Sequence, residues 1–254
     1  MFSSVKHIPS STCFKFTHLD IEACSLLQNR VDIWQYPLHT LWHEALDLLS
    51  KSEVERAQRY YFDRHRRRFI VARATLRLIL SRYIENTTPK DLEFVENEYG
   101  KPQLAHYPYL HFNISHSADL ALLAIGKDYP VGIDLEFFSA RPYAGIGSQM
   151  FSTTENQAFQ QLAKHIQPLS FFHIWAQKEA FIKACGLGLS YPTQQFDVPH
   201  LPVTDLKIQD NLHNKRWHMV SFMPKVACSA AVCYHPQINE VRYISIENNY
   251  DLTQ

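Results

Sequence analysis

The chain contains 254 residues, of which 46% are hydrophobic and 20% are charged, and 25 basic side chains balance 25 acidic ones at neutral pH. This composition is typical of a globular protein of one large or two small domains, and it excludes a fibrous or disordered chain. The balanced charge argues against a nucleic-acid partner, which would select a basic surface.

Signals for targeting and for oxidised cysteines are weak along the chain. Residues 1–6 lack the long apolar core of a signal peptide, and no apolar run approaches the roughly 18 residues that cross a membrane. The five cysteines are scattered and odd in number, without the spacing of metal ligands. We therefore expect a cytoplasmic protein with reduced thiols and no membrane partner.

The first element that bears on function is a basic helical region near 56–77. Its apolar stripe, which continues beyond that range, consists of Phe69, Ala72, Leu76, Ile79, Leu80 and Tyr83. Helical periodicity places Arg68 and Arg73 at the two borders of this stripe, where each can be half-buried beside a ligand. A solvated basic face is the simpler interpretation for the others, which are Arg64, Arg66, Arg67 and Arg77.

Segment 112–117, Phe-Asn-Ile-Ser-His-Ser, places two serines around His116. Hydroxyl, imidazole and backbone N–H groups at a turn suit phosphate oxygens, although one histidine among 14 is on its own more simply structural. Residues 120–125 are expected to form a buried strand that turns at 127–130 into 131–136. The two motifs are therefore predicted to be the ends of one β-hairpin.

Asp134 and Glu136 lie two residues apart in the predicted strand, so both carboxylates project from one face while Ile133 and Leu135 point to the other. Two adjacent carboxylates repel each other unless they are solvated, share a proton or share a cation. A hard divalent ion such as Mg²⁺ takes carboxylate oxygens together with water and substrate phosphate. On the strand alone, a solvated sheet face explains the pair equally well.

The next segment combines a loop signal with a helix start. Residues 137–150 contain a proline and two glycines and are predicted to form a mobile loop. Its apolar side chains could either contact a partner helix or pack in the core, and these are Phe137, Phe138, Ile146, Met150 and Phe151. Ser152 and Glu155 have the spacing of a capping box, which is sufficient to explain both residues.

A helix predicted to end at Gly186 carries a further charged motif. Trp175, Glu179 and Lys183 recur every four residues and share one face, with Lys178 one step round from Glu179. Glu179 can therefore present an oxygen beside cationic groups. For this helix in isolation, a surface glutamate–lysine pair anchored by aromatic residues is the simpler explanation.

Taken together, four motifs resemble the ordered signature of the surfactin-type (Sfp-type) 4′-phosphopantetheinyl transferases. They are Gly100-Lys101-Pro102, residues 113–117, residues 132–136, and Trp175 to Lys183 with Lys178-Glu179-Ala180. The resemblance implies an α+β fold of two similar α/β lobes related by a pseudo-twofold axis, with the active site between them, in a monomer. The implied N-terminal lobe is residues 1–108 and the C-terminal lobe is residues 109–254, although no internal sequence repeat is visible.

The resemblance also implies a transferase. Such an enzyme moves the 4′-phosphopantetheine arm of coenzyme A to a serine of an acyl or peptidyl carrier protein and releases 3′,5′-ADP. The implied cofactor is Mg²⁺, bound by Asp134, Glu136 and Glu179, and coenzyme A is the co-substrate. A cation at the pyrophosphate suits phosphoryl-type transfer, in which positioning and charge neutralisation matter most.

Further roles follow from the same resemblance. Glu179 or a metal-bound water would take the proton from the carrier serine, Lys183 would hold the pyrophosphate, and His116 would contact a phosphate of coenzyme A. The coenzyme A ligands would be Arg56, Arg68, Lys101, Ser115, His116, Lys178 and Lys183. Lys101 could equally be an exposed turn lysine beside a proline. The acidic residues within 52–56 depart from relatives, which often have an additional lysine there.

Two other functions remain open at this point. A different Mg²⁺-dependent nucleotide enzyme would be expected to carry a Gly-x-x-x-x-Gly-Lys-Ser/Thr phosphate loop, and the sequence has none. A binding protein that holds coenzyme A without turnover would be expected to have lost a metal carboxylate, yet all three are present. Neither the carrier's pathway nor the choice between coenzyme A and acyl-coenzyme A follows from one sequence.

Overall fold

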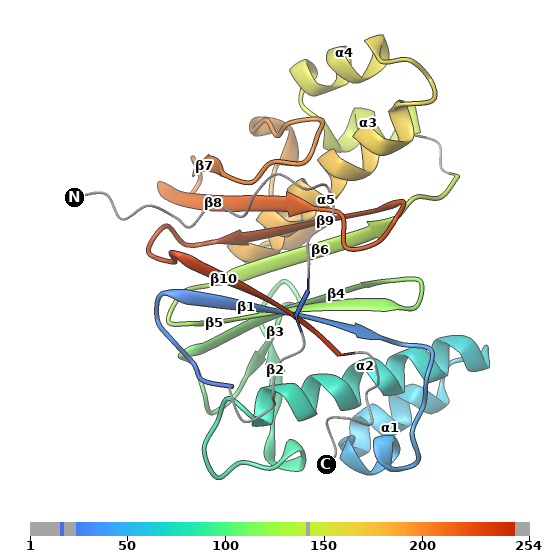
Figure 1. The fold of residues 1–254 in the computed structure, drawn as a ribbon, viewed down its shortest axis with the longest axis vertical. Helices are drawn as coiled ribbons and strands as arrows, with labels where there is room; N and C mark the ends of the chain where they lie inside the picture. The colour runs from blue at the N-terminus through green and yellow to red at the C-terminus, as the bar shows by residue number, and fades with distance from the viewer. Residues whose placement is uncertain (1–15, 18–23, 141–142, 247–254) are drawn as a thin grey trace.

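The computed structural model describes residues 16–17, 24–140 and 143–246. Two four-stranded sheets pack against each other, and helices cover their outer faces (Figure 1). The first sheet consists, in spatial order, of β10 (Glu240–Ser245), β1 (Arg30–Pro37), β5 (Leu120–Lys127) and β4 (Leu110–Ser117). The second consists of β6 (Val131–Phe137), β9 (Cys228–Tyr234), β8 (Lys215–Phe222) and β7 (Leu206–Asp210).

The remaining elements lie outside these two sheets. A small hairpin is formed by β2 (Phe94–Glu96) and β3 (Pro102–Leu104). The helices are α1 (Lys51–Gln58), α2 (Asp63–Ser81), α3 (Tyr143–Met150), α4 (Thr153–Gln161) and α5 (Gln167–Cys185). Short 3-10 turns occur at His43–Leu48, Pro89–Asp91, Gly188–Ser190 and Thr193–Gln195. The predicted class, α+β, is confirmed.

The segments 30–127 and 131–234, called the two halves below, share part of their connectivity, although the β2–β3 hairpin precedes β4 in the first and β7 precedes β8 in the second. In each half a first strand leads to a long helix of 19 residues, α2 or α5, and then to an antiparallel pair of strands. The first strand pairs antiparallel with the last, β1 with β5 and β6 with β9. A pseudo-twofold axis between the halves stays a prediction.

The chain passes from the first sheet to the second between β5 and β6, which is later than the predicted lobe boundary at residue 108. Both β4 and β5 follow that boundary, yet they pair with β1 in the first sheet. Strand β10 also returns to this sheet and pairs parallel with β1 (Figure 1). The predicted hairpin of residues 120–125 with 131–136 is wrong, because β1 and β4 already occupy both edges of β5.

Each long helix buries an apolar face against its own sheet. Two of the four inner strands, β5 and β9, are buried along almost their whole length, which explains their runs of small and branched apolar residues. An apolar cluster fills the space between the two sheets and includes Ile33, Leu122 and Ile133. Within the described part of the chain, no helix is both long and apolar enough to cross a membrane.

Arg77 does not lie on a solvated face, and that prediction is wrong. Only 2% of its surface is exposed, and its Nε donates to Glu53 Oε2 at 2.8 Å. Glu53 also accepts from Arg73 Nε at 2.6 Å and closes a capping box with Ser50 at the start of α1. Although burial opposes the charge, these arginines hold the pKa of Glu53 below its ordinary value. Glu53 is therefore a structural anion between two arginines.

Candidate active site

Side chains of β4 hold the free edge of β6. Asn113 Oδ1 accepts from Ile133 N at 2.7 Å, and Ser117 Oγ accepts from Phe137 N at 3.1 Å. The backbone pairing of β6 runs to β9 on its other side. Alternate side chains of β4 therefore take the place of a backbone ladder. They fix β6 beside the motif of residues 112–117 in β4.

Gly132 lets α5 lie directly on β6. A Cβ atom at this position would be 2.1 Å from Ala180 O and 2.3 Å from Ala184 N, both in α5. No side chain fits in that space, which is the physical reason for a glycine inside the strand. The close approach brings Glu179 and Lys183 of α5 over the strand that carries the acidic pair.

Asp134 is the centre of the polar cluster. It is 4% exposed, and its Oδ1 accepts from Lys183 Nζ at 2.6 Å and from Ser115 Oγ at 2.8 Å. Its Oδ2 is buried without a hydrogen-bond partner among the described residues. A buried carboxylate oxygen left unsatisfied is costly, so this atom is a ready acceptor for a cation or a proton donor.

The other two predicted metal ligands lie within electrostatic reach of Asp134. Burial and then the negative charge of Asp134 raise the pKa of Glu179 to about 7, with a smaller effect of Glu136 and an opposing effect of Lys183. Ser117 Oγ donates to Glu136 Oε2 at 3.2 Å. Among the residues that the structure describes, no three histidine, cysteine or acidic side chains are close enough to hold a metal by themselves.

His116 lies at the exposed end of β4, next to Ser115. The surrounding protein and then the Lys183 ammonium lower the pKa of His116, so its ring is mainly neutral at pH 7. Arg68 of α2 reaches the same end of the strand, where its Nε donates to Asp119 at 2.7 Å. The partly exposed guanidinium of Arg68 and the imidazole of His116 therefore flank the carboxylate cluster on the side of the first sheet.

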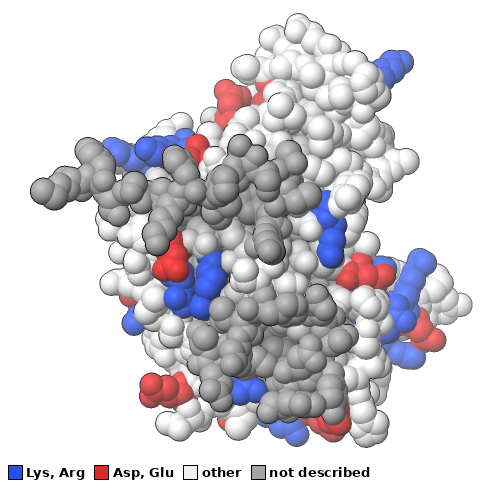
Figure 2. All heavy atoms as spheres, in the orientation of Figure 1, with Lys and Arg blue, Asp and Glu red and all other residues white. Residues whose placement is uncertain are grey.

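Arg56 lies in a separate basic hollow of ≈ 790 Å³ between α1, α2 and the β2–β3 hairpin. Its guanidinium stacks over the Phe69 ring at 5.2 Å, and its side chain is exposed. The hollow is also lined by Arg59, Arg73, Lys90 and three glutamates. Figure 2 shows basic side chains mixed with acidic ones at the end of the molecule that carries α1 and the start of α2.

Lys178 does not lie at the site, and the prediction that it binds coenzyme A is wrong. It is 0% exposed, and its Nζ donates to Thr193 O at 2.6 Å and to Phe196 O at 2.8 Å. Glu155 Oε2 is 2.9 Å from the same ammonium group. Because Lys178 leaves α5 one step round from Glu179, it points to a different neighbour. The capping box of Ser152 and Glu155 is confirmed.

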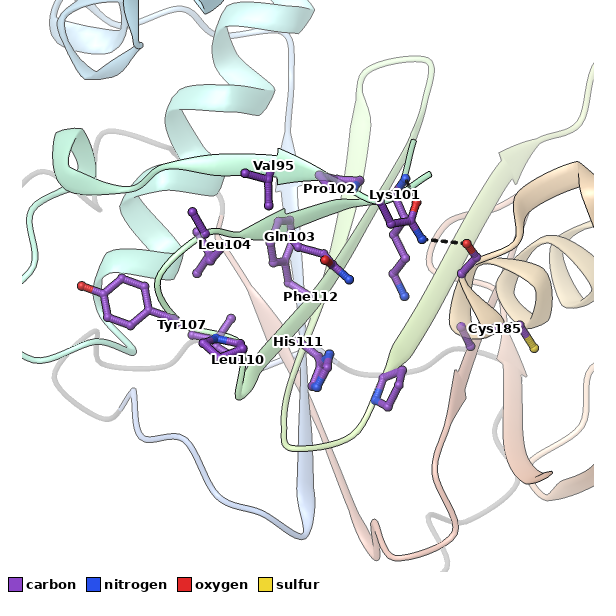
Figure 3. Close-up of a pocket in the computed structure, with 16 residues that line it drawn as sticks. Val95, Lys101, Pro102, Gln103, Leu104, Tyr107, Leu110, His111, Phe112 and Cys185 are labelled. Carbon is purple, nitrogen blue, oxygen red and sulfur yellow. Dashed lines mark hydrogen bonds between the residues drawn. The ribbon is translucent and has the colours of Figure 1, made fainter. Parts of the chain in front are cut away.

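Lys101 is turned towards the junction of the two halves and away from the carboxylates. Its Nζ donates to Lys183 O at 2.7 Å and to Val131 O at 3.0 Å. Figure 3 shows its side chain extending from the hairpin along a pocket of ≈ 330 Å³ towards the end of α5. Contact of Lys101 with coenzyme A stays a prediction, whereas its alternative as an exposed turn lysine is wrong.

The predicted loop at residues 137–150 is partly helical, because Tyr143–Met150 forms α3, while residues 141–142 lie outside the described part. Phe138 stacks on Phe172 at 5.1 Å, and Phe151 is 1% exposed. Ile146 and Met150 also pack against the core beneath α5. Core packing, the second of the two alternatives, therefore explains Phe138, Ile146, Met150 and Phe151.

Comparisons with known proteins identify the family of this chain. Residues 130–233 match the family model of the 4′-phosphopantetheinyl transferase superfamily, and residues 33–127 match the model of the 4′-phosphopantetheinyl transferase N-terminal part. The 4′-phosphopantetheinyl transferase HetI of Nostoc sp. is 34% identical over 217 residues, which cover 82% of this chain and 89% of the relative.

Two further relatives carry related names. The 4′-phosphopantetheinyl transferase Sfp of Bacillus subtilis is 34% identical over 154 residues, covering 60% of this chain and 67% of the relative. The L-aminoadipate-semialdehyde dehydrogenase-phosphopantetheinyl transferase of Mus musculus is 30% identical over 182 residues, covering 65% and 58%. These matches confirm the resemblance, and the chain belongs to the 4′-phosphopantetheinyl transferase superfamily.

Proposed function

We propose that this enzyme moves the 4′-phosphopantetheine arm of coenzyme A to a serine of an acyl or peptidyl carrier protein. The observation that carries the proposal is the cluster in which Lys183 and Ser115 both contact Asp134 Oδ1 while Glu179 lies close by. It joins a cation for phosphate oxygens, a buried anion and a second carboxylate between the two halves. The names of the relatives point to the same reaction.

Mg²⁺ is the metal that fits the residues best. Asp134 Oδ2 is buried without a partner among the described residues, and burial and then the negative charge of Asp134 raise the pKa of Glu179. Mg²⁺ usually takes one or two carboxylates and completes its shell with water and substrate phosphate, so three preassembled protein ligands are not required. Asp134, Glu136 and Glu179 would hold it, and it would neutralise charge on the pyrophosphate.

The chain's own residues would then position the reactants. Lys183 would place its ammonium on a pyrophosphate oxygen, since it already lies at the cluster with part of its side chain exposed. The carrier serine oxygen forms a bond to the phosphorus that bears the pantetheine, and the bond from that phosphorus to the oxygen of 3′,5′-ADP breaks. The serine proton passes to Glu179 or to a water.

Residues of β4, α1 and α2 would bind coenzyme A. Ser115 and His116 stand at the end of β4 beside Asp134, where the His116 ring N–H can meet a phosphate oxygen and the Ser115 hydroxyl would do so by exchanging its bond to Asp134. Arg68 lies at the same end, and Arg56 lines the basic hollow on the Arg73 side of α2. We assign the 3′-phosphate to Arg68 and the neighbouring part of coenzyme A to Arg56, because guanidinium groups match phosphate geometry.

One chain supplies both sides of the cluster, Ser115 from the first sheet and Asp134 from the second, so we propose that the enzyme acts as a monomer. The four cysteines in the described ranges are free thiols, which suits a reducing cytoplasm. The acidic and basic totals are equal, and no nucleic-acid or membrane partner is proposed.

The experiment is intact-protein mass spectrometry of several apo-carrier proteins after incubation with this protein, coenzyme A and Mg²⁺. A mass gain of one phosphopantetheine group that needs the metal and is lost in Asp134→Ala supports the proposal. Binding of coenzyme A without any covalent product would favour the non-catalytic binding protein. ATP hydrolysis without coenzyme A would instead favour a different nucleotide enzyme.

A further inference from the structure

The turn between β2 and β3 crosses the junction and holds the end of α5. Lys101 Nζ donates to Lys183 O at 2.7 Å and to Val131 O at 3.0 Å. Asn97 Nδ2 donates to Gly186 O at 2.8 Å, and Asn97 Oδ1 accepts from Lys101 N at 2.8 Å. We call Asn97 and Lys101 the hairpin clamp, and Figure 3 shows Lys101 in this position.

The clamp satisfies backbone groups that secondary structure leaves open. The last carbonyls of a helix have no partner within it, and α5 ends at Cys185 with Gly186 turning the chain at φ 80°. An ammonium group at this end also meets the negative end of the helix dipole. Val131 O lies at the start of β6, whose strand partner is β9. Lys101 therefore ties the start of β6 to the end of α5.

Lys183 is consequently held both at its backbone carbonyl and at its side-chain ammonium group. Its carbonyl oxygen accepts from Lys101, and its own Nζ lies 2.6 Å from Asp134 Oδ1. The second carbonyl that Lys101 binds, Val131 O, is in the strand that carries Asp134. One ammonium group on the N-terminal side thus fixes both elements of the C-terminal half whose side chains meet in the cluster.

We propose that Lys101 is a positioning residue, which sets the geometry of the Lys183–Asp134 pair through two backbone carbonyls and does not bind a phosphate of coenzyme A. This inference rests on the proposed function for its kinetic test. Two of the three N–H donors of the ammonium group are already committed to fixed carbonyls. Burial lowers the pKa of Lys101 to about 8, which agrees with an enclosed position.

The test compares Lys101→Met and Lys101→Arg with Lys207→Met, an exposed lysine on β7 that serves as the matched control. For each variant, the dissociation constant of coenzyme A is measured by calorimetry and kcat by formation of holo-carrier. We expect kcat of Lys101→Met to fall about tenfold or more, because small misplacements of catalytic groups are costly. The coenzyme A affinity should change by less than about threefold, and Lys101→Arg should restore most of kcat.

The opposite pattern, in which coenzyme A affinity changes and kcat does not, would overturn the proposal. If Lys101→Met weakens coenzyme A binding about tenfold while kcat at saturation is unchanged, Lys101 is a ligand of coenzyme A. Wild-type values for both constants would show that the clamp has no role in the reaction. The control, Lys207→Met, should match the wild type in both measurements.

A readout without turnover separates this inference from the proposed reaction. Hydrogen exchange of the amides in β6 and in the last turn of α5 should accelerate in Lys101→Met and in Asn97→Ala, and it should stay at wild-type rates in Lys207→Met. Asn97→Ala keeps the lysine and also covers the case in which Lys101→Met does not fold. Unchanged exchange in both clamp variants would refute the positioning role even if no carrier is modified by the wild type.

Discussion

Gly132 and Ala180 are in direct backbone contact across the strand β6 and the helix α5. A Cβ on Gly132 would lie 2.1 Å from Ala180 O, well inside any allowed contact distance. Asp134 is on the same face of the strand two residues later, and Glu179 precedes Ala180. The absence of one side chain therefore sets how near the two carboxylates come.

Gly132→Ala should destabilise the chain and abolish its activity, since the helix must move away from the strand. Overpacking of a rigid backbone contact costs about 1–3 kcal/mol or more of unfolding free energy. Urea unfolding measures this change. The matched control is Gly145→Ala in α3, where a Cβ meets no atom of the described residues within 4 Å and where alanine should be neutral or slightly stabilising. Equal stability of the two variants would contradict the close contact.

The pH dependence of stability should report on Glu179. Its pKa rises from 4.5 to about 7 on folding, because of burial and the charge of Asp134. Between these values the unfolded chain holds fewer protons at Glu179 than the folded chain does. The free energy of unfolding should therefore fall as pH rises through this window in metal-free buffer.

Glu179→Gln should remove that slope and leave the variant more stable than the wild type at about pH 8. Urea unfolding at several pH values, with chelator present, measures the difference between the two proteins. Adding Mg²⁺ should stabilise the wild type more than the variant, because the metal binds the ionised carboxylate. Parallel pH curves for the two proteins would show that Glu179 is not the group that titrates.

Lys178→Met should lower stability without affecting coenzyme A binding. The ammonium group is fully buried beside Glu155, and its removal leaves a buried carboxylate without its cation. Breaking such a pair typically costs about 3–5 kcal/mol. Thermal and urea unfolding give the loss, and the double variant with Glu155→Leu should recover part of it. Loss of coenzyme A affinity in the folded variant would restore the original assignment of Lys178.

Arg68→Ala should weaken binding of coenzyme A much more than binding of dephospho-coenzyme A, which lacks the 3′-phosphate. A charge-assisted hydrogen bond of about 1.5–3 kcal/mol corresponds to a loss of about tenfold or more. Calorimetry with both ligands measures the difference. The control is Arg66→Ala, because Arg66 is an exposed arginine of the same helix that pairs with Asp63. Equal losses for both ligands would place Arg68 away from the 3′-phosphate.

Local periodicity predicted the parts of the site that depend on one element. The two-residue spacing of Asp134 and Glu136 and the four-residue spacing of Glu179 and Lys183 each give a shared face whatever the surroundings. The αL residue Gly186 at the end of α5 was predicted for the same reason, since a helix stop is a local property.

Buried charges were missed because their partners are distant in sequence. Arg77 and Lys178 have the same local patterns as solvated residues, and only the fold brings Glu53 and Glu155 to them. The contacts of Asn113 and Ser117 with β6 were missed as well. A signal was present, because polar residues alternate through the otherwise apolar strand β4, and such a row can satisfy a neighbouring strand edge.

The parallel pairing of β10 with β1 has a consequence for biosynthesis. Asp32 of β1 is 3% exposed and receives two hydrogen bonds from Arg242 of β10, at 2.9 and 2.6 Å. During translation β1 leaves the ribosome long before β10 does, so the first sheet waits with one open edge and an incompletely paired carboxylate. A nascent chain halted before residue 240 should therefore engage chaperones, and release of the last strand should complete folding.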